Sequence, residues 1–324
     1  MHRLRLDGGV FERETNAYLV LGNDEEPTTL IDTGIGTAAA EQSLRDALAS
    51  HSVTIEDIDQ LFVTHFHYDH CGLASRIQRE SGATVLCHSA DEPFIATDAD
   101  GLIDRLTTHD RVLDRWGVPE PPRHALQQFL ETSAELGGGT VDVSTVGNGE
   151  TLTVGTKAAT VCHLPGHTAG QIGLEFANRQ MVVGDAMLPT TTPNVGGDIR
   201  CENPLADFLM AIRRIVDADP DIVWPGHGEP IRTPVERANA ICNHHRHRAG
   251  RMLDALTPDS FASPWTVAGE VFGDLSGIHV LNGTGEAAAH LTFLATHDLV
   301  DEEDGRYRRL ADRGLPDELF PEFD

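Results

Sequence analysis

The sequence predicts an α/β fold followed by a smaller helical part. Over the first two thirds of its 324 residues, short apolar runs of strand length alternate with helical patterns. Four strand ends carry histidine or aspartate beside turn residues. After Arg232 the strand-rich pattern gives way to three helical patterns and a hairpin. We therefore expect two domains, residues 1–234 and 235–324, since a chain of this length allows one large and one small domain.

The chain opens with two strand-like runs, residues 17–21 and 29–31, followed by a helical pattern from about Thr37 to Ser50. Asp32 comes directly after the second run. Its carboxylate could simply cap a turn, or it could hold the second ring N–H of a metal-binding histidine. Both interpretations of Asp32 stay open at this point.

The next strand end carries the most distinctive pattern in the chain. Three imidazoles and one carboxylate lie within six positions, His65 to His70, directly after an apolar run. In an extended segment alternate side chains point the same way, so His65 and His67 can bind one ion. The turn into the following helix can bring Asp69 and His70 toward a second ion. A chance run of polar residues is the alternative, but imidazole with carboxylate is the donor set of zinc and similar divalent ions.

Three later strand ends present single candidates of the same chemistry. His167 follows a strand and a turn-forming Pro-Gly pair, while His163 still lies in the strand and is interpreted as a packed side chain. Asp185 follows the second strand of a hairpin beside a glycine, which suits a carboxylate that bridges two cations. His227 lies between two glycines after a further strand.

Residues 91–139 interrupt the strand-rich part of the chain. Two helical patterns, 102–116 and 125–136, are separated by a proline-rich turn and closed by Gly137-Gly138-Gly139. Such a helical insertion is either padding or a lid. Its place between a metal-binding strand and the next strand favours a lid over the site.

The composition limits which kinds of binding partner and which cellular compartment we expect. With 24 basic and 51 acidic residues the formal charge is −27, which repels nucleic acid and anionic membranes at low salt. The five cysteines are odd in number and form no C-x-x-C pair, so we expect reduced thiols, of which Cys71 is closest to the metal pattern. No apolar run approaches membrane-spanning length. We therefore expect a cytoplasmic protein with no membrane partner.

The chain carries four motifs in order: T-H-F-H-Y-D-H at 64–70, P-G-H-T at 165–168, G-D at 184–185 and P-G-H-G at 225–228. This set resembles the metallo-β-lactamase-fold hydrolases, and within them the glyoxalase II-like branch of thioester hydrolases. The resemblance covers about residues 17–230. It implies an αββα sandwich, in which two mixed sheets lie face to face with helices outside and the site along one edge.

The same resemblance implies a site for two divalent metal ions, with Zn²⁺ the expected metal. One ion would be held by three histidines and the other by one aspartate and two histidines, with a further aspartate bridging both. In this sequence the ligands are His65, His67 and His167; Asp69, His70 and His227; and the bridging Asp185. Asp69 is thus expected to serve catalysis as a ligand, and Asp32 as the supporting aspartate that the family carries behind its ligands.

The helical patterns of the C-terminal part cover 235–256, 266–275 and 283–299, and a hairpin turning at Asp304-Gly305 follows. This order resembles the small winged-helix domain that follows the catalytic domain in one branch of the superfamily. The helix that would enter a nucleic-acid groove carries Glu286 and Asp298 but no Arg or Lys, which argues against phosphate contacts. We expect a structural part that covers one side of the site or forms a homodimer contact.

The expected function is metal-assisted hydrolysis of a small-molecule substrate. Metal-bound hydroxide would attack the carbonyl of a thioester, or of another small ester or lactone. A thiolate leaves without a proton, so a thioester needs no separate general acid. The alternative is a phosphodiesterase or ribonuclease, since repulsion of nucleic acid fades in molar salt. A mononuclear-iron sulfur dioxygenase and a non-catalytic binding protein are further alternatives, which the complete ligand set disfavours.

The acidic composition also predicts salt-dependent stability. Lys157 is the only lysine, and an acidic, lysine-poor surface is similar in composition to the proteins of halophilic archaea. Like-charge repulsion reaches about 30 Å at 0.01 M salt but only about 3 Å at 1 M, and arginine keeps paired contacts in concentrated salt. We expect the melting temperature and the activity to rise together from dilute buffer to molar KCl. A melting temperature independent of KCl would contradict this halophilic interpretation.

Overall fold

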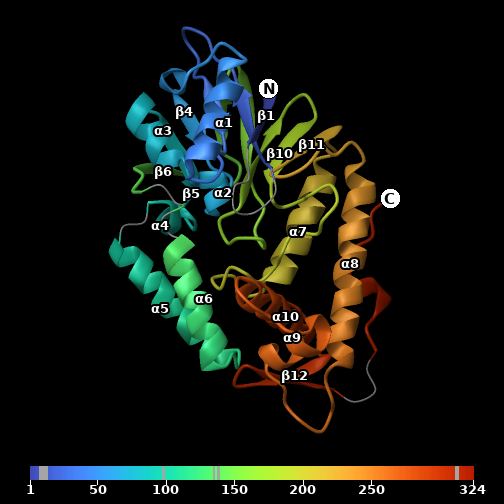
Figure 1. Ribbon diagram of the computed structural model, residues 1–324. Coiled ribbons are helices and arrows are strands. Elements are labelled where there is room, and N and C mark those ends of the chain that lie inside the picture. The colour runs from blue at the N-terminus through green and yellow to red at the C-terminus, as the bar shows by residue number, and fades with distance from the viewer. Residues whose placement is uncertain (7–13, 97–98, 134–135, 137–138, 311–313) are drawn as a thin grey trace.

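Two β-sheets lie face to face, and helices cover the outer face of each (Figure 1). The structure is a computed structural model that describes residues 1–6, 14–96, 99–133, 136, 139–310 and 314–324. Its layers confirm the predicted α/β class and the αββα sandwich. A helical C-terminal region lies at the lower end of the molecule in the view of Figure 1.

The first sheet has six strands in the order β1-β2-β3-β4-β5-β6. They are β1 (His2–Leu6), β2 (Thr15–Val20), β3 (Thr29–Ile31), β4 (Gln60–Phe62), β5 (Thr84–His88) and β6 (Val143–Val146). The first three are antiparallel neighbours, whereas β3 to β6 run parallel. The sequence pattern does not predict β1 or β6. In β1 basic residues interrupt the apolar ones, and in the edge strand β6 only Val146 is buried, so neither has an apolar run.

The second sheet has five strands in the order β11-β10-β9-β8-β7. They are β7 (Thr151–Val154), β8 (Lys157–His163), β9 (Ile172–Phe176), β10 (Gln180–Gly184) and β11 (Ile222–Pro225). β7 to β10 are antiparallel neighbours, and β11 pairs parallel to β10. As a result β8, β10 and β11 all run in one direction, and their carboxyl ends meet at one edge.

Both faces of the central strands are buried, which explains their continuous apolar runs. In the run Leu61-Phe62-Val63, Phe62 points between the sheets, where it belongs to the same cluster as Val161 and Leu174. Leu61 and Val63 point the other way, into the cluster beneath the outer helices. The strand before the metal pattern is thus fixed from both sides, and so is the point at which it ends.

Helices cover the outer faces of both sheets. α1 (Ala38–Ala49) and α3 (Ala74–Ser81) pack on the first sheet, and the short α2 (Tyr68–Cys71) lies between its strands β4 and β5 in sequence. α7 (Pro204–Asp217) and α8 (Pro234–Asp254) pack on the second sheet. This placement leaves one edge of the sandwich to the loops that follow the strands.

The helical insertion consists of α4 (Glu92–Ile95), α5 (Ala99–Arg115) and α6 (Glu120–Ser133). Its far end packs against the C-terminal helices in a cluster made of Leu113, Val118, Leu126, Val280 and Leu281. Figure 1 shows α5 and α6 descending from the sheets to this contact. Of the expected glycine hinge, Gly137 and Gly138 lie outside the described residues, and the role of the insertion as a lid stays a prediction.

The C-terminal region adds α9 (Pro264–Phe272), α10 (His279–Thr296) and a hairpin of β12 (Val300–Glu303) and β13 (Arg306–Arg309). α9 starts two residues before the predicted position, because Pro264 is its first residue and Ser263 accepts the N–H of Thr266 at 3.2 Å. α10 starts four residues early, since Gly283 lies within the helix and not at its start. The domain boundary after residue 234 and the winged-helix resemblance stay predictions.

Glu286, one of the two acids that the sequence places on the helix predicted over 283–299, is a buried residue. Glu286 is only 4% exposed and accepts a hydrogen bond from Arg248 of α8. Twelve of the eighteen residues of α10 are buried. The helix is therefore a core element of this region.

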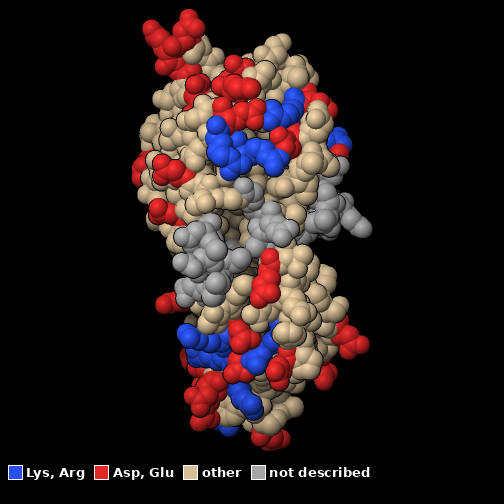
Figure 2. Space-filling model, turned by 60° about the vertical axis from the view of Figure 1, so that its left-hand side comes forward, with Lys and Arg blue, Asp and Glu red and all other residues tan. Residues whose placement is uncertain are grey.

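Acidic side chains are spread over the face shown in Figure 2, and the basic ones gather in groups bordered by acids. Arg45, for example, lies 2.8 Å from Glu41 and 2.6 Å from Glu80. Exposed pairs of this kind contribute about 0–1 kcal/mol each. Among the described helices, none has the length and apolar character that crossing a membrane requires.

Candidate metal centre

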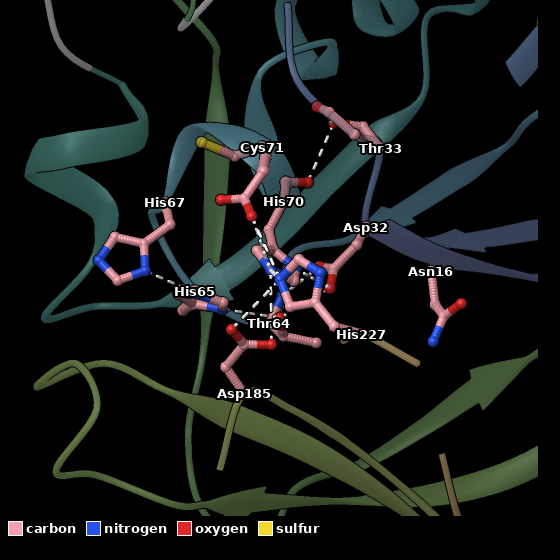
Figure 3. Close-up of polar contacts among 12 residues, drawn as sticks. Asn16, Asp32, Thr33, Thr64, His65, His67, His70, Cys71, Asp185 and His227 are labelled. Atoms are coloured by element: carbon pink, nitrogen blue, oxygen red, sulfur yellow. Dashed lines mark hydrogen bonds and ion pairs between the residues drawn. The ribbon is translucent and has the colours of Figure 1, made fainter. Parts of the chain in front are cut away.

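The predicted ligands follow the carboxyl ends of strands from both sheets, and the structure brings them together at one edge of the sandwich (Figure 3). Asp32 follows β3 and His65 follows β4 in the first sheet. His167, Asp185 and His227 follow β8, β10 and β11 in the second. Backbone hydrogen bonds join the two sheets here, such as that from the N–H of Ile172 to the carbonyl of Thr64 at 2.9 Å.

The first group of ring nitrogens belongs to three histidines. Nδ1 of His67 lies 3.0 Å from Nε2 of His65 and 3.1 Å from Nε2 of His167. His65 is fully buried and His167 is 8% exposed. These three nitrogens converge on one point, as the pattern His65-x-His67 with a later histidine predicts.

The second group combines one carboxylate with two histidines. Oδ2 of Asp69 lies 3.2 Å from Nε2 of His227, and Nε2 of His70 lies 3.4 Å from the same nitrogen. Asp69 and His70 come from the short helix α2, whereas His227 comes from the loop after β11 on the other sheet. The turn into α2 thus brings Asp69 and His70 to His227, while the ring of His70 also stays beside that of His65, with ring centroids 4.2 Å apart.

Asp185 lies between the two groups. Its Oδ2 is 3.8 Å from Nε2 of His167 and 3.4 Å from Nε2 of His227, and its Oδ1 is 3.6 Å from Nε2 of His70. Oδ1 is buried without a hydrogen-bond partner among the described residues. A Cβ on Gly226 would lie 2.6 Å from His70 and closer still to Oδ1. The glycine keeps this space open, and an unsatisfied buried carboxylate oxygen in it fits a cation.

Asp32 sets the protonation pattern of one histidine in each group. Its carboxylate accepts the N–H and the hydroxyl of Thr64, both at 2.8 Å, and its Oδ2 lies 2.8 Å from Nδ1 of His70. Because the carboxylate can only accept, the Thr64 hydroxyl donates to it and in turn accepts from Nδ1 of His65 at 3.1 Å. Nε2 of His65 then carries no proton and has a free lone pair. Of the two interpretations of Asp32, the contact with His70 is the one the structure shows.

Two other histidines have the same arrangement with backbone carbonyls. Nδ1 of His167 donates to the carbonyl of Asn194 at 2.9 Å, and Nδ1 of His227 donates to the carbonyl of Glu14 at 3.0 Å. Each leaves Nε2 directed at the site. Partners that hold the outer ring nitrogen are typical of metal-binding histidines, because they fix the orientation and tautomer of the ring.

The electrostatics differ between the two sides of the site. Burial and the nearby imidazoles lower the pKa of His67 to about 3. Burial also lowers the pKa of His227, but the carboxylates of Asp185 and Asp69 outweigh it and raise that pKa to about 11. For His70 the same carboxylates, with Asp32, overcome burial and raise the pKa to about 9. The carboxylate-rich side therefore attracts positive charge, which either protons or a cation can supply.

The residues present fit divalent metal ions. Imidazole nitrogens with carboxylate oxygens are the donors that zinc and other first-row divalent ions prefer. The donors form the groups His65, His67 and His167; His65, His70 and Asp185; and Asp69, His70 and His227, in each of which the donor atoms lie within 4.8 Å of one another. The assignment of individual residues to individual ions remains a proposal.

The sequence pattern does not identify Asp91, a fully buried residue beside the site. Its Oδ2 accepts from the N–H of Phe66 at 3.1 Å and the hydroxyl of Thr168 at 3.0 Å, and its Oδ1 accepts from the N–H of Gly170 at 3.0 Å and from Arg200 at 2.8 Å. The carboxylate thus ties the loop of His65 and His67 to the loop of His167. Asp91 could have been recognised from the sequence, because it comes shortly after β5, at the same edge of the sheet as the predicted ligands.

Cys71 and His163, the two other candidates near the motifs, lie aside from the ligands. The thiol of Cys71 donates to the carbonyl of Phe66 at 3.1 Å and points away from the carboxylates in Figure 3. His163 is the last residue of β8, and its Nε2 lies 2.8 Å from the carbonyl oxygen of Ala169. Both side chains are thus engaged in packing and backbone contacts.

Comparison with known proteins finds one family model and several relatives. The sequence model of the metallo-β-lactamase superfamily matches residues 10–227. The chain is 28% identical over 293 residues to the probable metallo-hydrolase YqjP of Bacillus subtilis, covering 87% of this chain and 88% of that protein. It is 24% identical over 201 residues to the acyl-coenzyme A thioesterase MBLAC2 of Bos taurus, covering 60% and 61%. The crystal structure of a metallo-β-lactamase family protein from Thermus thermophilus superposes with a TM-score of 0.81 at 26% identity, covering 95% of this chain and 98% of that one.

We expect close to two divalent ions per chain, with Asp185 shared between them. Asp185→Asn should weaken the binding of both ions, because its carboxylate faces both groups, whereas His227→Ala should mainly weaken one. Elemental analysis and competition with a chelator would measure this. A firm limit of one ion in zinc-saturated wild-type protein would reject the dinuclear assignment, and equal losses in the two variants would reject the bridging role.

Asp91→Ala should both destabilise the fold and weaken the metal position of His65, His67 and His167. Breaking a buried carboxylate–arginine pair typically costs about 3–5 kcal/mol, and losing a group that holds ligands typically costs about 10–100-fold in metal affinity. Chemical unfolding and chelator competition would measure the two effects. Asp221→Ala is the matched control, since it removes an exposed partner of Arg179 whose loss costs far less. Equal effects of the two variants would contradict a role for Asp91.

Proposed function

Because the chain belongs to the metallo-β-lactamase superfamily, we propose that it is a dinuclear metal-dependent hydrolase acting on a thioester or another small ester or lactone. The observation that carries this proposal is the position of Asp185 between two groups of donors, with an unsatisfied buried oxygen. Two adjacent cation positions that share a carboxylate are the arrangement of two-metal hydrolytic sites.

In this proposal His65, His67 and His167 hold one ion, Asp69, His70 and His227 hold the other, and Asp185 contacts both. Two divalent ions, with Zn²⁺ the expected species, lower the pKa of water and polarise a carbonyl oxygen. The protein holds the ligand rings in fixed tautomers through Asp32, Thr64 and two backbone carbonyls. Ligands that are held in place before the reaction lower the free energy needed to reorganise the site during the reaction.

The substrate would approach where the predicted ligands are partly exposed. The side chains of Asp69 and His227 are 19% and 16% exposed, and His67 is also partly exposed, whereas His65 and His70 are fully buried. Asp69 lies at the boundary between the buried ligands and solvent, which supports the proposed role of Asp69 in catalysis.

A thioester is favoured among the possible substrates for two reasons. A relative covering 60% of this chain is an acyl-coenzyme A thioesterase by name. A thiolate also leaves without a proton, so the ligands described here are sufficient without a separate general acid. We retain cytoplasmic localisation and a small-molecule substrate as parts of the proposal, and a homodimer contact as an alternative role of the C-terminal region.

Zinc-loaded protein in molar KCl should hydrolyse acyl-coenzyme A thioesters faster than lactones, β-lactams or an aromatic phosphodiester. Removal of the metal by a chelator should abolish the activity, and zinc should restore it. Activity on the phosphodiester alone would favour the nuclease-like alternative. Oxygen uptake with a persulfide in protein that holds one iron would favour the sulfur dioxygenase, and either result would contradict the proposal.

A further inference from the structure

The loop between β10 and α7, which carries Asn194, is held by the C-terminal helices. The side-chain amide of Asn194 donates to Oε2 of Glu286 at 3.0 Å and to the carbonyl of Asn282 at 3.2 Å, both on α10. Oε1 of Glu286 accepts from Arg248 on α8. At the start of α8, Arg237 donates to the carbonyls of two further residues of the loop, Leu188 and Thr191, at 2.6 and 2.8 Å, respectively. Both helices therefore fix one loop.

This loop in turn fixes a ligand of the candidate metal centre. The carbonyl of Asn194 accepts from Nδ1 of His167 at 2.9 Å, and Nε2 of the same ring lies 3.1 Å from Nδ1 of His67. The carbonyl thus determines both the tautomer and the direction of the His167 ring. Since the side chain of Asn194 is bound to α10, its backbone carbonyl cannot move independently of that helix.

A close backbone contact next to Asn194 strengthens the connection. A Cβ on Gly285 of α10 would lie 2.7 Å from the carbonyl carbon of Gly196 and closer still to its oxygen. In the reverse direction, a Cβ on Gly196 would lie 2.6 Å from the carbonyl carbon of Gly285. Real Cβ atoms do not approach other atoms this closely, so any side chain at either position displaces the loop from the helix.

Glu286 also forms a buried group with His245 and His290 whose donor atoms lie within 4.8 Å of one another. Its existing contacts identify it as a structural network. Both oxygens of Glu286 already accept, from Arg248 and Asn194, and Nδ1 of His245 lies 3.2 Å from Nε2 of His290. The guanidinium of Arg248 already neutralises the carboxylate of Glu286, and the other oxygen of this carboxylate holds Asn194.

We propose that Gly285 and Glu286 are positioning residues for the metal position formed by His65, His67 and His167, so that the C-terminal helices are a structural part of the metal centre. Glu286 holds the side chain of Asn194, Gly285 lets the loop approach α10, and the carbonyl of Asn194 orients His167. This inference rests on the proposed metal site, and its test measures binding at one position separately from catalysis.

The test compares two glycine-to-alanine variants in helices. Gly285→Ala should lower metal affinity at the His65, His67 and His167 position on the order of tenfold, while the other position keeps its affinity. Gly269→Ala on α9 is the matched control, because nothing lies within 4 Å of its added Cβ. Both changes favour the helix intrinsically to a similar degree, because alanine has a higher helix propensity than glycine. Chelator competition and the visible absorption of Co²⁺-substituted protein would report the two positions.

Glu286→Gln is the second variant and decides the outcome if Gly285→Ala does not fold. The amide retains an oxygen for Asn194 but loses the charge that binds Arg248, so a smaller loss at the same position and an altered Co²⁺ spectrum are expected. Folded variants with wild-type affinity and spectra would overturn the proposal, as would an equal loss in Gly269→Ala. Wild-type protein that binds no ion at this position would instead overturn the proposed function.

Discussion

The candidate site depends on the hydrogen bonds that the carboxylate of Asp32 accepts. It is 1% exposed, and it accepts hydrogen bonds from Thr64 and lies against His70, so it connects the end of β3 to both groups of donors. Its backbone has φ of 58°, a left-handed conformation that aspartate tolerates better than most residues. Its N–H donates to the carbonyl of Phe62 at 2.9 Å. One residue therefore joins the pairing of two strands to the orientation of the predicted ligands that follow them.

The strand-end pattern marks the candidate site in the sequence because most of the information is local. His65, His67, Asp69 and His70 lie within six positions, and the later ligands each follow a strand and a glycine or proline. Burial of both faces of the sheet strands makes those strands visible as apolar runs. The αββα sandwich is implied by the family resemblance that the motifs carry, and the strands β1 and β6, which the pattern does not predict, are those without an apolar run.

The groups behind the ligands could not be predicted in the same way. Asn194 acts on His167 through its backbone carbonyl, a group that every residue carries and that no sequence pattern marks. Glu286 lies 92 positions from Asn194, so their contact is a product of the tertiary fold. Its charge suggests a surface residue, and only the packing of α10 shows that it is buried. Asp91 is partly predictable: it follows a strand, which a sequence pattern can show, but it binds partners up to 109 positions away, which a pattern cannot show.

The contact between Gly196 and Gly285 has a consequence for how sequences of this kind can vary. Gly285 lies in a helix and is required because the backbone of Gly196 is there, whereas Gly196 also has a φ of 93°, a left-handed conformation that favours glycine. A chain in which the loop before α7 is longer, or α10 is shifted, is therefore free to carry a larger residue at position 285, but a chain that keeps this loop is not. Position 285 should therefore change among related sequences only together with the loop and with the partners of Asn194. A catalytic part and a C-terminal region taken from different relatives would then be mismatched at this contact, even if each folds correctly by itself.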